Sequence, residues 1–209
     1  MKTTILILQL FILSSMSAQD TLFLPEPVMT GGMPLMEALK KRCTTREFAD
    51  KELSMQQISN LLWAATGVNR PETGKMTAPT ARDSREIDVY IVLKTATYKY
   101  VPAQNILILQ KMGDFRSDVG KQDFTKEAAL GLLYVVDFSK MPNTPQEKLD
   151  LYGATDTGFI SQNVYLFCAS ENLATVVLGS INREEIAATF QFSKNQKVIL
   201  TQVVGFPTK

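Results

Sequence analysis

The octapeptide Lys41–Phe48, KRCTTREF, concentrates side chains that bind anions. Its three cations and two hydroxyls belong to Lys41, Arg42, Arg46, Thr44 and Thr45. An arginine fork matches phosphate oxygens in bidentate geometry, and a nearby hydroxyl or backbone N–H can complete the cage. A basic helix end that faces solvent and complements the helix dipole has the same composition. From these eight residues alone, both interpretations stay open.

The absence of histidine narrows the chemistry further. The 209 residues contain no histidine and only two cysteines, Cys43 and Cys168. The chain therefore has no imidazole base, no Ser-His or Cys-His nucleophile pair and no four-thiolate metal site. Asp114, Asp118 and Asp123 lack a spacing that would converge on a metal, and we interpret them as a solvated loop. We expect no metal, and in an enzyme an organic cofactor would carry the chemistry.

Composition and charge indicate an ordinary globular protein. The net charge is +1 and 45% of the residues are hydrophobic. A charge so near zero leaves no electrostatic footprint for nucleic acid or for an anionic membrane surface. We therefore expect a small-molecule substrate and no nucleic acid partner.

The first residues have the layout of a secretory signal peptide, with a basic start, an apolar run and a small-residue exit. We expect a signal peptide over 1–18, a leader over 19–33 and one domain over 34–209, in an exported periplasmic or secreted protein. The apolar run is shorter than the ~20 residues that span a bilayer, which argues against an uncleaved anchor. Export would permit a disulfide, but the apolar run around Cys168 favours a buried free thiol.

Hydrophobic periodicity predicts helices and strands that form one α+β domain. Helices are expected over 34–41, 54–67, 155–170 and 183–189, and the segment between Val136 and Thr155 shows no lid helix. Strands are expected over 88–93, 97–100, 105–109, 132–136, 175–178 and 198–204. Because several strands are continuously apolar, we expect helices on both faces of the sheet. Trp63 and Tyr90 are assigned to packing.

Four motifs in order resemble the FMN-dependent nitroreductase family. They are KRCTTREF with the following helix that ends in LLWAATGV, then TAPTARDSRE before a strand, DTGFISQNVYL, and VGFP. The resemblance covers essentially the whole mature chain. TAPTA and the strands through Tyr98 and Tyr100 look most like the azoline-oxidising, SagB-type dehydrogenases. The resemblance implies a three-layer fold with a central mixed sheet, in an intertwined homodimer with two FMN sites at its interface.

The resemblance also assigns roles in FMN binding. Arg42 and Thr44 would contact the phosphate or ribityl chain, and Cys43 would contribute backbone. Arg46 would lie near the pyrimidine edge of the ring, where a cation stabilises the charge of the reduced flavin. Lys209 falls where the family often places a phosphate-binding cation.

Other candidate residues come from two further segments. Pro79, Thr80 and Ala81 would line the flavin of the partner subunit. Gly179 and Ser180 would approach the N5 side, where a glycine permits close contact. Asp83 lies in the same stretch as Pro79, Thr80 and Ala81 and is also a candidate for cofactor binding. The family usually has an amide side chain there, and Asp83 is placed to pair with Arg85 instead.

Three functions follow as expectations. The first is an exported FMN oxidoreductase that passes electrons to a nitroaromatic or a quinone and takes them from a donor other than NAD(P)H. The second is a SagB-type dehydrogenase that oxidises its substrate through FMN. The third is a non-enzymatic flavin-binding protein with a degenerate site.

Overall fold

The computed structural model describes residues 21–208, and eight of their strands form one central sheet. The order along the sheet is β1-β7-β6-β5-β8-β10-β2, and β9 also pairs with β10. Their bounds are β1 (Thr21–Phe23), β2 (Phe48–Ala49), β5 (Ile87–Val92), β6 (Ala96–Val101), β7 (Ile106–Met112), β8 (Leu130–Asp137), β9 (Ala174–Leu178) and β10 (Gln196–Pro207). A separate hairpin pairs β3 (Val68–Arg70) with β4 (Lys75–Met76).

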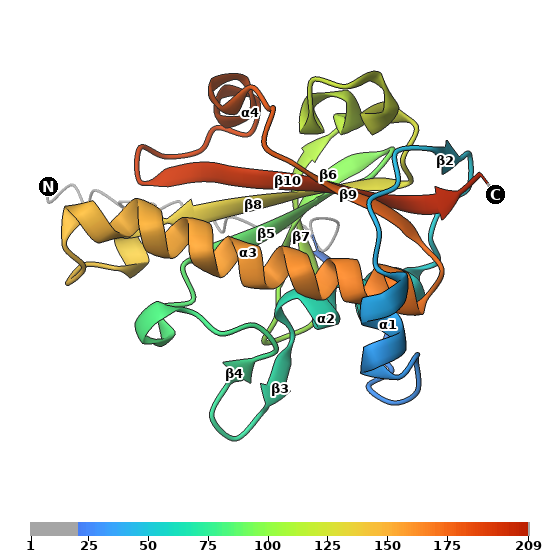
Figure 1. Cartoon of the computed structure of the whole chain (residues 1–209). Helices are drawn as coiled ribbons and strands as arrows, with labels where there is room; N and C mark the ends of the chain where they lie inside the picture. The colour runs from blue at the N-terminus through green and yellow to red at the C-terminus, as the bar shows by residue number, and fades with distance from the viewer. Residues whose placement is uncertain (1–20, 209) are drawn as a thin grey trace, which may run out of the picture.

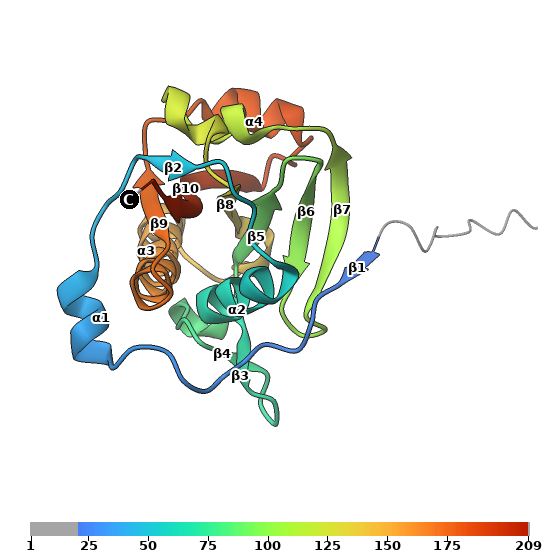
Figure 2. The same cartoon turned by 90° about the vertical axis from the view of Figure 1, so that its right-hand side faces the viewer.

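Helices cover both faces of the sheet and complete three layers (Figure 1). On one side lie α1 (Leu35–Lys41), α2 (Met55–Thr66) and α3 (Gln146–Ser170). On the other side lie α4 (Arg183–Thr189) and the 3-10 turns η3 (Arg116–Val119) and η4 (Asp123–Lys126), as Figure 2 shows. Two further 3-10 turns are η2 (Ala81–Asp83) and η5 (Phe138–Lys140). The predicted α+β fold with a helix-flanked sheet is confirmed, but every strand pairing between described residues is antiparallel rather than mixed.

The apolar strands explain the two helical layers. Along β8, Leu132 and Tyr134 join the core cluster that contains α2 and α3 residues. The alternate residues Leu133 and Val135 join the cluster that contains Ile186 of α4. Successive side chains of a strand point to opposite faces, so a continuously apolar strand needs a cover on each side.

Local signals set the ends of α2 as predicted. The Ser54 hydroxyl accepts from the Gln57 backbone N–H, and the Gln57 side chain accepts from the Ser54 N–H, which completes a capping box. This arrangement satisfies two donors that a helix start leaves free. The helix ends before Gly67.

The start of α3 differs from the prediction. The helix begins at Gln146, so the segment before Thr155 is helical instead of lacking a helix. Leu149 is its one buried large apolar residue before Thr155, and Leu151 is 60% exposed. One buried leucine does not establish the 3.6-residue apolar repeat by which a sequence indicates a helix.

Some expectations fall on residues that the structure does not describe. The signal peptide over 1–18 lies outside 21–208, and so does Lys209. Within the described part of the chain, no helix combines the length and apolarity that crossing a bilayer requires. Cys168 is buried, as predicted, Cys43 is exposed, and both thiols are free.

Candidate functional site

The anion-binding segment, defined as residues 41–48, runs from the end of α1 to β2 and divides its side chains between two directions. Cys43 and Thr45 contact each other, with 3.6 Å between Sγ and Oγ1, and both line a hollow of about 530 Å³. Arg42 and Thr44 instead both contact Tyr165 of α3. The segment thus brings together two of the residues assigned to phosphate binding.

Tyr165 links the anion-binding segment to α3 and β9. Its hydroxyl accepts a hydrogen bond from the Val177 N–H at 3.0 Å and lies 3.0 Å from the Thr44 Oγ1. Its ring lies under the Arg42 guanidinium, 5.3 Å from ring centroid to Cζ. When the Tyr165 O–H donates to Thr44, the Thr44 proton stays free to donate to an anion. The arrangement holds a cation and a hydroxyl side by side without using a carboxylate.

The basic side chains of the segment differ in whether they form an ion pair. Lys41 pairs with Glu37 at 3.0 Å, one helical turn earlier on α1. Arg42 and Arg46 have no ion pair within residues 21–208, and the Arg46 side chain is exposed. The two arginines therefore carry the uncompensated positive charge of the segment.

Strand β9 connects the anion-binding segment to Gly179. The Thr45 N–H donates to the Thr175 carbonyl at 3.0 Å, near the start of β9. Gly179 and Ser180 follow the end of the strand and are exposed. A Cβ built on Gly179 would meet only Leu200, at an ordinary 3.7 Å, so internal packing does not demand a glycine there. A glycine at this exposed position leaves room for a ligand to approach the backbone closely.

The flavin loop, defined as residues 77–86, is held by a carboxylate of α3. The Ala81 N–H donates to Asp156 Oδ2 at 2.7 Å, and the Arg85 N–H donates to Thr80 Oγ1 at 3.1 Å. Arg82, Asp83 and Arg85 all have left-handed φ, between 51° and 58°. Such conformations cost free energy for non-glycine residues and persist only where surrounding contacts fix them.

Asp83 points its charge at its own loop. Its carboxylate accepts from Arg85 Nε at 3.2 Å and Nη2 at 3.0 Å, which forms the ion pair expected as the alternative to cofactor contact. This bond lowers the pKa of Asp83 and raises that of Arg85. Pro79 and Thr80 line a small hollow with Asp83, and Arg70 and Lys75 contribute to the same hollow.

Helix α3 holds both regions and keeps them apart. Tyr165 contacts the anion-binding segment and Asp156 contacts the flavin loop. Nine residues of helix separate the two side chains, or roughly 14 Å. In Figure 1 the loop with η2 lies toward one end of α3 and α1 toward the other. Cys43 lines the hollow beside the anion-binding segment, whereas Pro79, Thr80 and Asp83 line the one beside the flavin loop.

A buried carboxyl pair under the flavin loop was missed from the sequence. Glu86 is fully buried and Asp156 is 3% exposed. Burial, together with the neighbouring Asp156 carboxyl, raises the pKa of Glu86 to about 7. Ser84 donates to one Glu86 oxygen at 2.8 Å, whereas Oε1 has no partner among the described residues. The sequence feature that could have indicated this buried pair is a glutamate directly before an apolar strand.

The remaining candidates have structural roles or stay untested. Trp63 donates to the Val68 carbonyl, and Tyr90 packs against Phe192 at 5.0 Å, as expected of packing residues. Asp114 pairs with Arg116 at 2.7 Å. No metal-ligand cluster occurs among residues 21–208.

The end of the chain lies beside the anion-binding segment. Phe206 and Pro207 of β10 pair with Ala49 and Phe48 of β2. Thr208 then donates to Glu47 at 3.3 Å. The assignment of Lys209 to phosphate binding stays a prediction.

Comparison with known families decides the identity. The model of the nitroreductase family matches residues 39–206. The chain belongs to the nitroreductase family. A crystal structure of a protein assigned as a nitroreductase from Ralstonia eutropha JMP134 is 39% identical, with a TM-score of 0.87, over 91% of this chain and 90% of that one. A protein assigned as a nitroreductase from Methanocaldococcus jannaschii is 26% identical over 73% of this chain and 81% of its own length.

More distant nitroreductase-fold structures share the architecture alone. The E. coli microcin synthetase McbBCD complex contains a chain that is 18% identical, with a TM-score of 0.70, over 100% of this chain and 85% of that chain. An NADPH:FMN oxidoreductase from Vibrio harveyi, complexed with NAD+, is 17% identical, with a TM-score of 0.64, over 84% of this chain and 69% of that one.

Proposed function

We propose that this nitroreductase-family protein is an FMN-dependent oxidoreductase that passes electrons to a small electron-poor acceptor, of the nitroaromatic or quinone type. The observation that carries the proposal is the pairing of Arg42 and Thr44 on Tyr165 with no carboxylate to neutralise the arginine. An anion is the natural counterion for Arg42, and the phosphate of FMN is such an anion. The Vibrio harveyi relative, an NADPH:FMN oxidoreductase, supports the choice of flavin.

The residues present fit this cofactor. Arg42 and Thr44 would hold the phosphate or ribityl chain, beside the backbone of Cys43. Gly179, whose Cβ position is open, would let the ring approach the end of β9. Bound FMN supplies the transfer of electrons. The exposed Arg46 would place positive charge where the reduced ring becomes negative, which stabilises that form.

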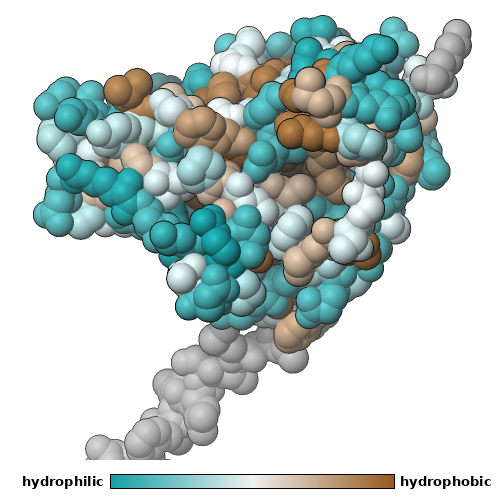
Figure 3. Space-filling model, turned by 60° about the horizontal axis from the view of Figure 1, so that its bottom comes forward, coloured by the Kyte–Doolittle hydropathy of each residue, from teal (hydrophilic) through white to brown (hydrophobic). Residues whose placement is uncertain are grey.

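We propose further that two copies of the chain form the complete site. The apolar side of α1 is not covered within one chain, because Leu35 is 62% and Met36 76% exposed. Val28 and Met29 of the leader are exposed as well, and Figure 3 shows brown apolar side chains among teal polar ones on this side of the molecule. A second copy on this surface would bury it and could bring the flavin loop of one chain to the anion-binding segment of the other.

We also propose that the protein is exported and that its electron donor is not NAD(P)H, because nicotinamide donors are scarce outside the cytoplasm. The residues that support export are the basic and apolar N-terminal residues. Steady-state turnover with NADPH at low micromolar half-saturation would contradict the proposed donor.

A SagB-type dehydrogenase, which would oxidise its substrate through FMN, is the second candidate. The full-length structural match to a chain of the microcin synthetase complex favours it. The two enzyme functions differ in the direction of electron flow. An azoline substrate that bleaches the flavin under anaerobic conditions supports the second candidate, whereas reoxidation of reduced flavin by nitroaromatics or quinones supports the first.

The decisive experiment is a fluorescence titration of the mature chain with FMN and riboflavin. We expect one FMN per chain, tighter binding of FMN than of riboflavin, and about 30- to 100-fold weaker FMN binding in Arg42→Ala, in line with loss of a charged hydrogen bond. Lys41→Ala is the matched control, since Lys41 already pairs with Glu37. A folded chain that ignores FMN, or equal losses in the two variants, would refute the phosphate site.

A further inference from the structure

A second cavity lies between the β3–β4 hairpin and the strands β5 and β6. Its volume is about 240 Å³, below the range typical of drug-sized ligands. Val68, Met76, Val89 and Tyr100 contribute to largely apolar walls. The cavity shares no lining residue with the hollow at the anion-binding segment. It adjoins the hollow at the flavin loop through Met76, and its walls suit a small molecule with an apolar body.

One buried polar group of this cavity lacks a partner. Thr66, the last residue of α2, lines the cavity and is 1% exposed. Its hydroxyl has no hydrogen-bond partner among the described residues. An unpaired buried hydroxyl costs about 1–3 kcal/mol, so a ligand atom that pairs with it gains that interaction at little additional desolvation. The inner end of the cavity can thus recognise a hydroxyl or another small polar group.

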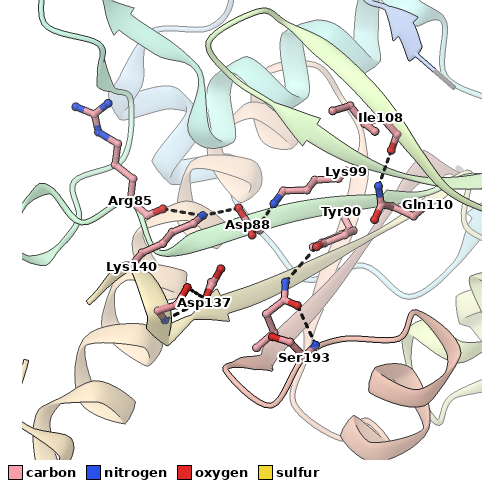
Figure 4. A network of polar contacts seen from close by, with 11 residues as sticks. Arg85, Asp88, Tyr90, Lys99, Ile108, Gln110, Asp137, Lys140 and Ser193 are labelled. Atoms are coloured by element: carbon pink, nitrogen blue, oxygen red, sulfur yellow. Dashed lines mark hydrogen bonds and ion pairs between the residues drawn. The ribbon is translucent and has the colours of Figure 1, made fainter. Parts of the chain in front are cut away.

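The rim of the cavity carries one lysine, Lys140, that pairs with Asp88. Asp88 accepts from Lys99 at 2.8 Å and from Lys140 at 2.7 Å, so two ammonium groups share one carboxylate. Lys140 also donates to the Arg85 carbonyl at 3.3 Å, which leaves one of its three N–H bonds free. Figure 4 shows Lys140 between Asp88 and the Arg85 backbone, with the Arg85 guanidinium directed away from them. That guanidinium pairs with Asp83, and Lys99 pairs with Asp88 without lining the cavity, so Lys140 supplies the free cationic donor at this rim.

The hairpin fixes the outer wall. A Cβ on Gly74, at its turn, would lie 3.3 Å from Arg85 Nη1, so the turn already rests against the guanidinium. Gly74 has φ of +65°, which a glycine adopts without strain. The position of Arg85, and with it this wall, therefore depends on the flavin loop and on the hairpin together.

We propose that this cavity binds a small monocarboxylate with a ring-sized apolar body and a polar group at the far end. The carboxylate would pair with Lys140, the body would lie against the apolar walls, and the far polar group would reach Thr66. The free N–H of Lys140 favours an anion over an amine, and the volume excludes a ligand as large as a flavin. The binding site does not depend on the proposed flavin chemistry.

The test uses 4-hydroxybenzoate as the probe, with benzoate, 4-hydroxybenzamide and 4-hydroxybenzylamine as comparisons. Binding to the mature chain, without added FMN, is measured by calorimetry and by saturation-transfer NMR. We expect 4-hydroxybenzoate to bind at least tenfold more tightly than the amide or the amine. In Thr66→Val, 4-hydroxybenzoate should bind no more tightly than benzoate. In Lys140→Gln, it should bind no more tightly than 4-hydroxybenzamide. Ala103→Trp, at an exposed lining residue, should block all binding.

Two control variants test whether the probe binds in this cavity and nowhere else. Lys197→Gln removes a lysine that pairs with Asp150 on the surface and should leave probe binding unchanged. Arg42→Ala weakens the proposed flavin site and should also leave probe binding unchanged. Retention of binding in Ala103→Trp, loss of binding in Arg42→Ala, or no binding by the wild type at millimolar probe would each overturn the proposal. Circular dichroism and thermal unfolding report whether Thr66→Val, Lys140→Gln and Ala103→Trp are folded.

Discussion

The anion-binding segment and the flavin loop both contact α3, yet their charged side chains have different kinds of partner. The segment holds Arg42 through an aromatic ring and a hydroxyl, which leaves its charge without a counterion among the described residues. The loop pairs Asp83 with Arg85 and rests on a buried carboxyl pair. Arg42 is therefore available to an external anion, whereas Asp83 and Arg85 are used within the strained loop. Arg82 is the one basic side chain of the loop with no ion pair among residues 21–208.

The free energy of unfolding should depend on pH because of Glu86 in the flavin loop, and not because of the anion-binding segment. The pKa of Glu86 is raised to about 7 from an ordinary 4.5, so the folded chain binds this proton more tightly than the unfolded chain. The contribution is complete below about pH 4.5 and is lost as pH rises through about 7, at up to about 3 kcal/mol. Urea unfolding between pH 5.5 and 8 measures it.

Glu86→Gln should flatten this dependence, because the amide resembles the protonated acid. Asp83→Asn is the control, since Asp83 is exposed and its lowered pKa places its titration below this pH range. A slope that stays unchanged in Glu86→Gln would show that the buried pair does not share a proton.

Removing the Tyr165 hydroxyl should weaken the segment alone. Tyr165→Phe leaves the Val177 N–H and the Thr44 hydroxyl without their partner and should lower the free energy of unfolding by about 2 kcal/mol. FMN affinity should fall as well, because Thr44 is no longer held. Tyr100→Phe is the matched control, since its hydroxyl bonds Asn105 elsewhere. Equal FMN affinity in the two variants would contradict a role for Tyr165 in positioning Thr44.

The comparison also explains what the sequence could reveal. Ser54 and Gln57 cap α2 through neighbours three residues apart, and such local signals were read correctly. The contact between Thr44 and Tyr165 spans 121 residues, and that between Ala81 and Asp156 spans 75. Residue types suggested an anion site, but only the packing of α3 shows what holds it.

The same distinction applies to the errors. The first nine residues of α3 were missed because Leu149 is their one buried large apolar residue. The mixed sheet came from the family resemblance, whereas strand pairing direction depends on connections that composition does not encode. The buried Glu86 was missed because a single charged residue beside a strand usually faces solvent.

Gly179→Ala should affect ligand binding while leaving the fold intact. Its Cβ would sit 3.7 Å from Leu200, an ordinary contact, so the unfolding free energy should barely change. FMN affinity should fall about tenfold, or about 1.4 kcal/mol, if the ring approaches this backbone. Gly67→Ala is the contrasting variant, because its Cβ would lie 2.2 Å from Trp63 Cδ1 and should destabilise the fold. Unaltered FMN binding in Gly179→Ala would place the ring elsewhere.

The smallest effect is expected from the charges of the loop. Asp83→Ala combined with Arg85→Ala removes an exposed ion pair, and such pairs contribute little because water already solvates both charges. FMN affinity should therefore match that of the wild type, in contrast to Arg42→Ala, although both changes remove an arginine. The single variant Asp83→Ala frees the Arg85 charge and is the informative comparison. Tighter FMN binding in that variant would mean that Arg85 can also reach a phosphate, and that the ion pair, rather than the position of the loop, is what separates the two regions.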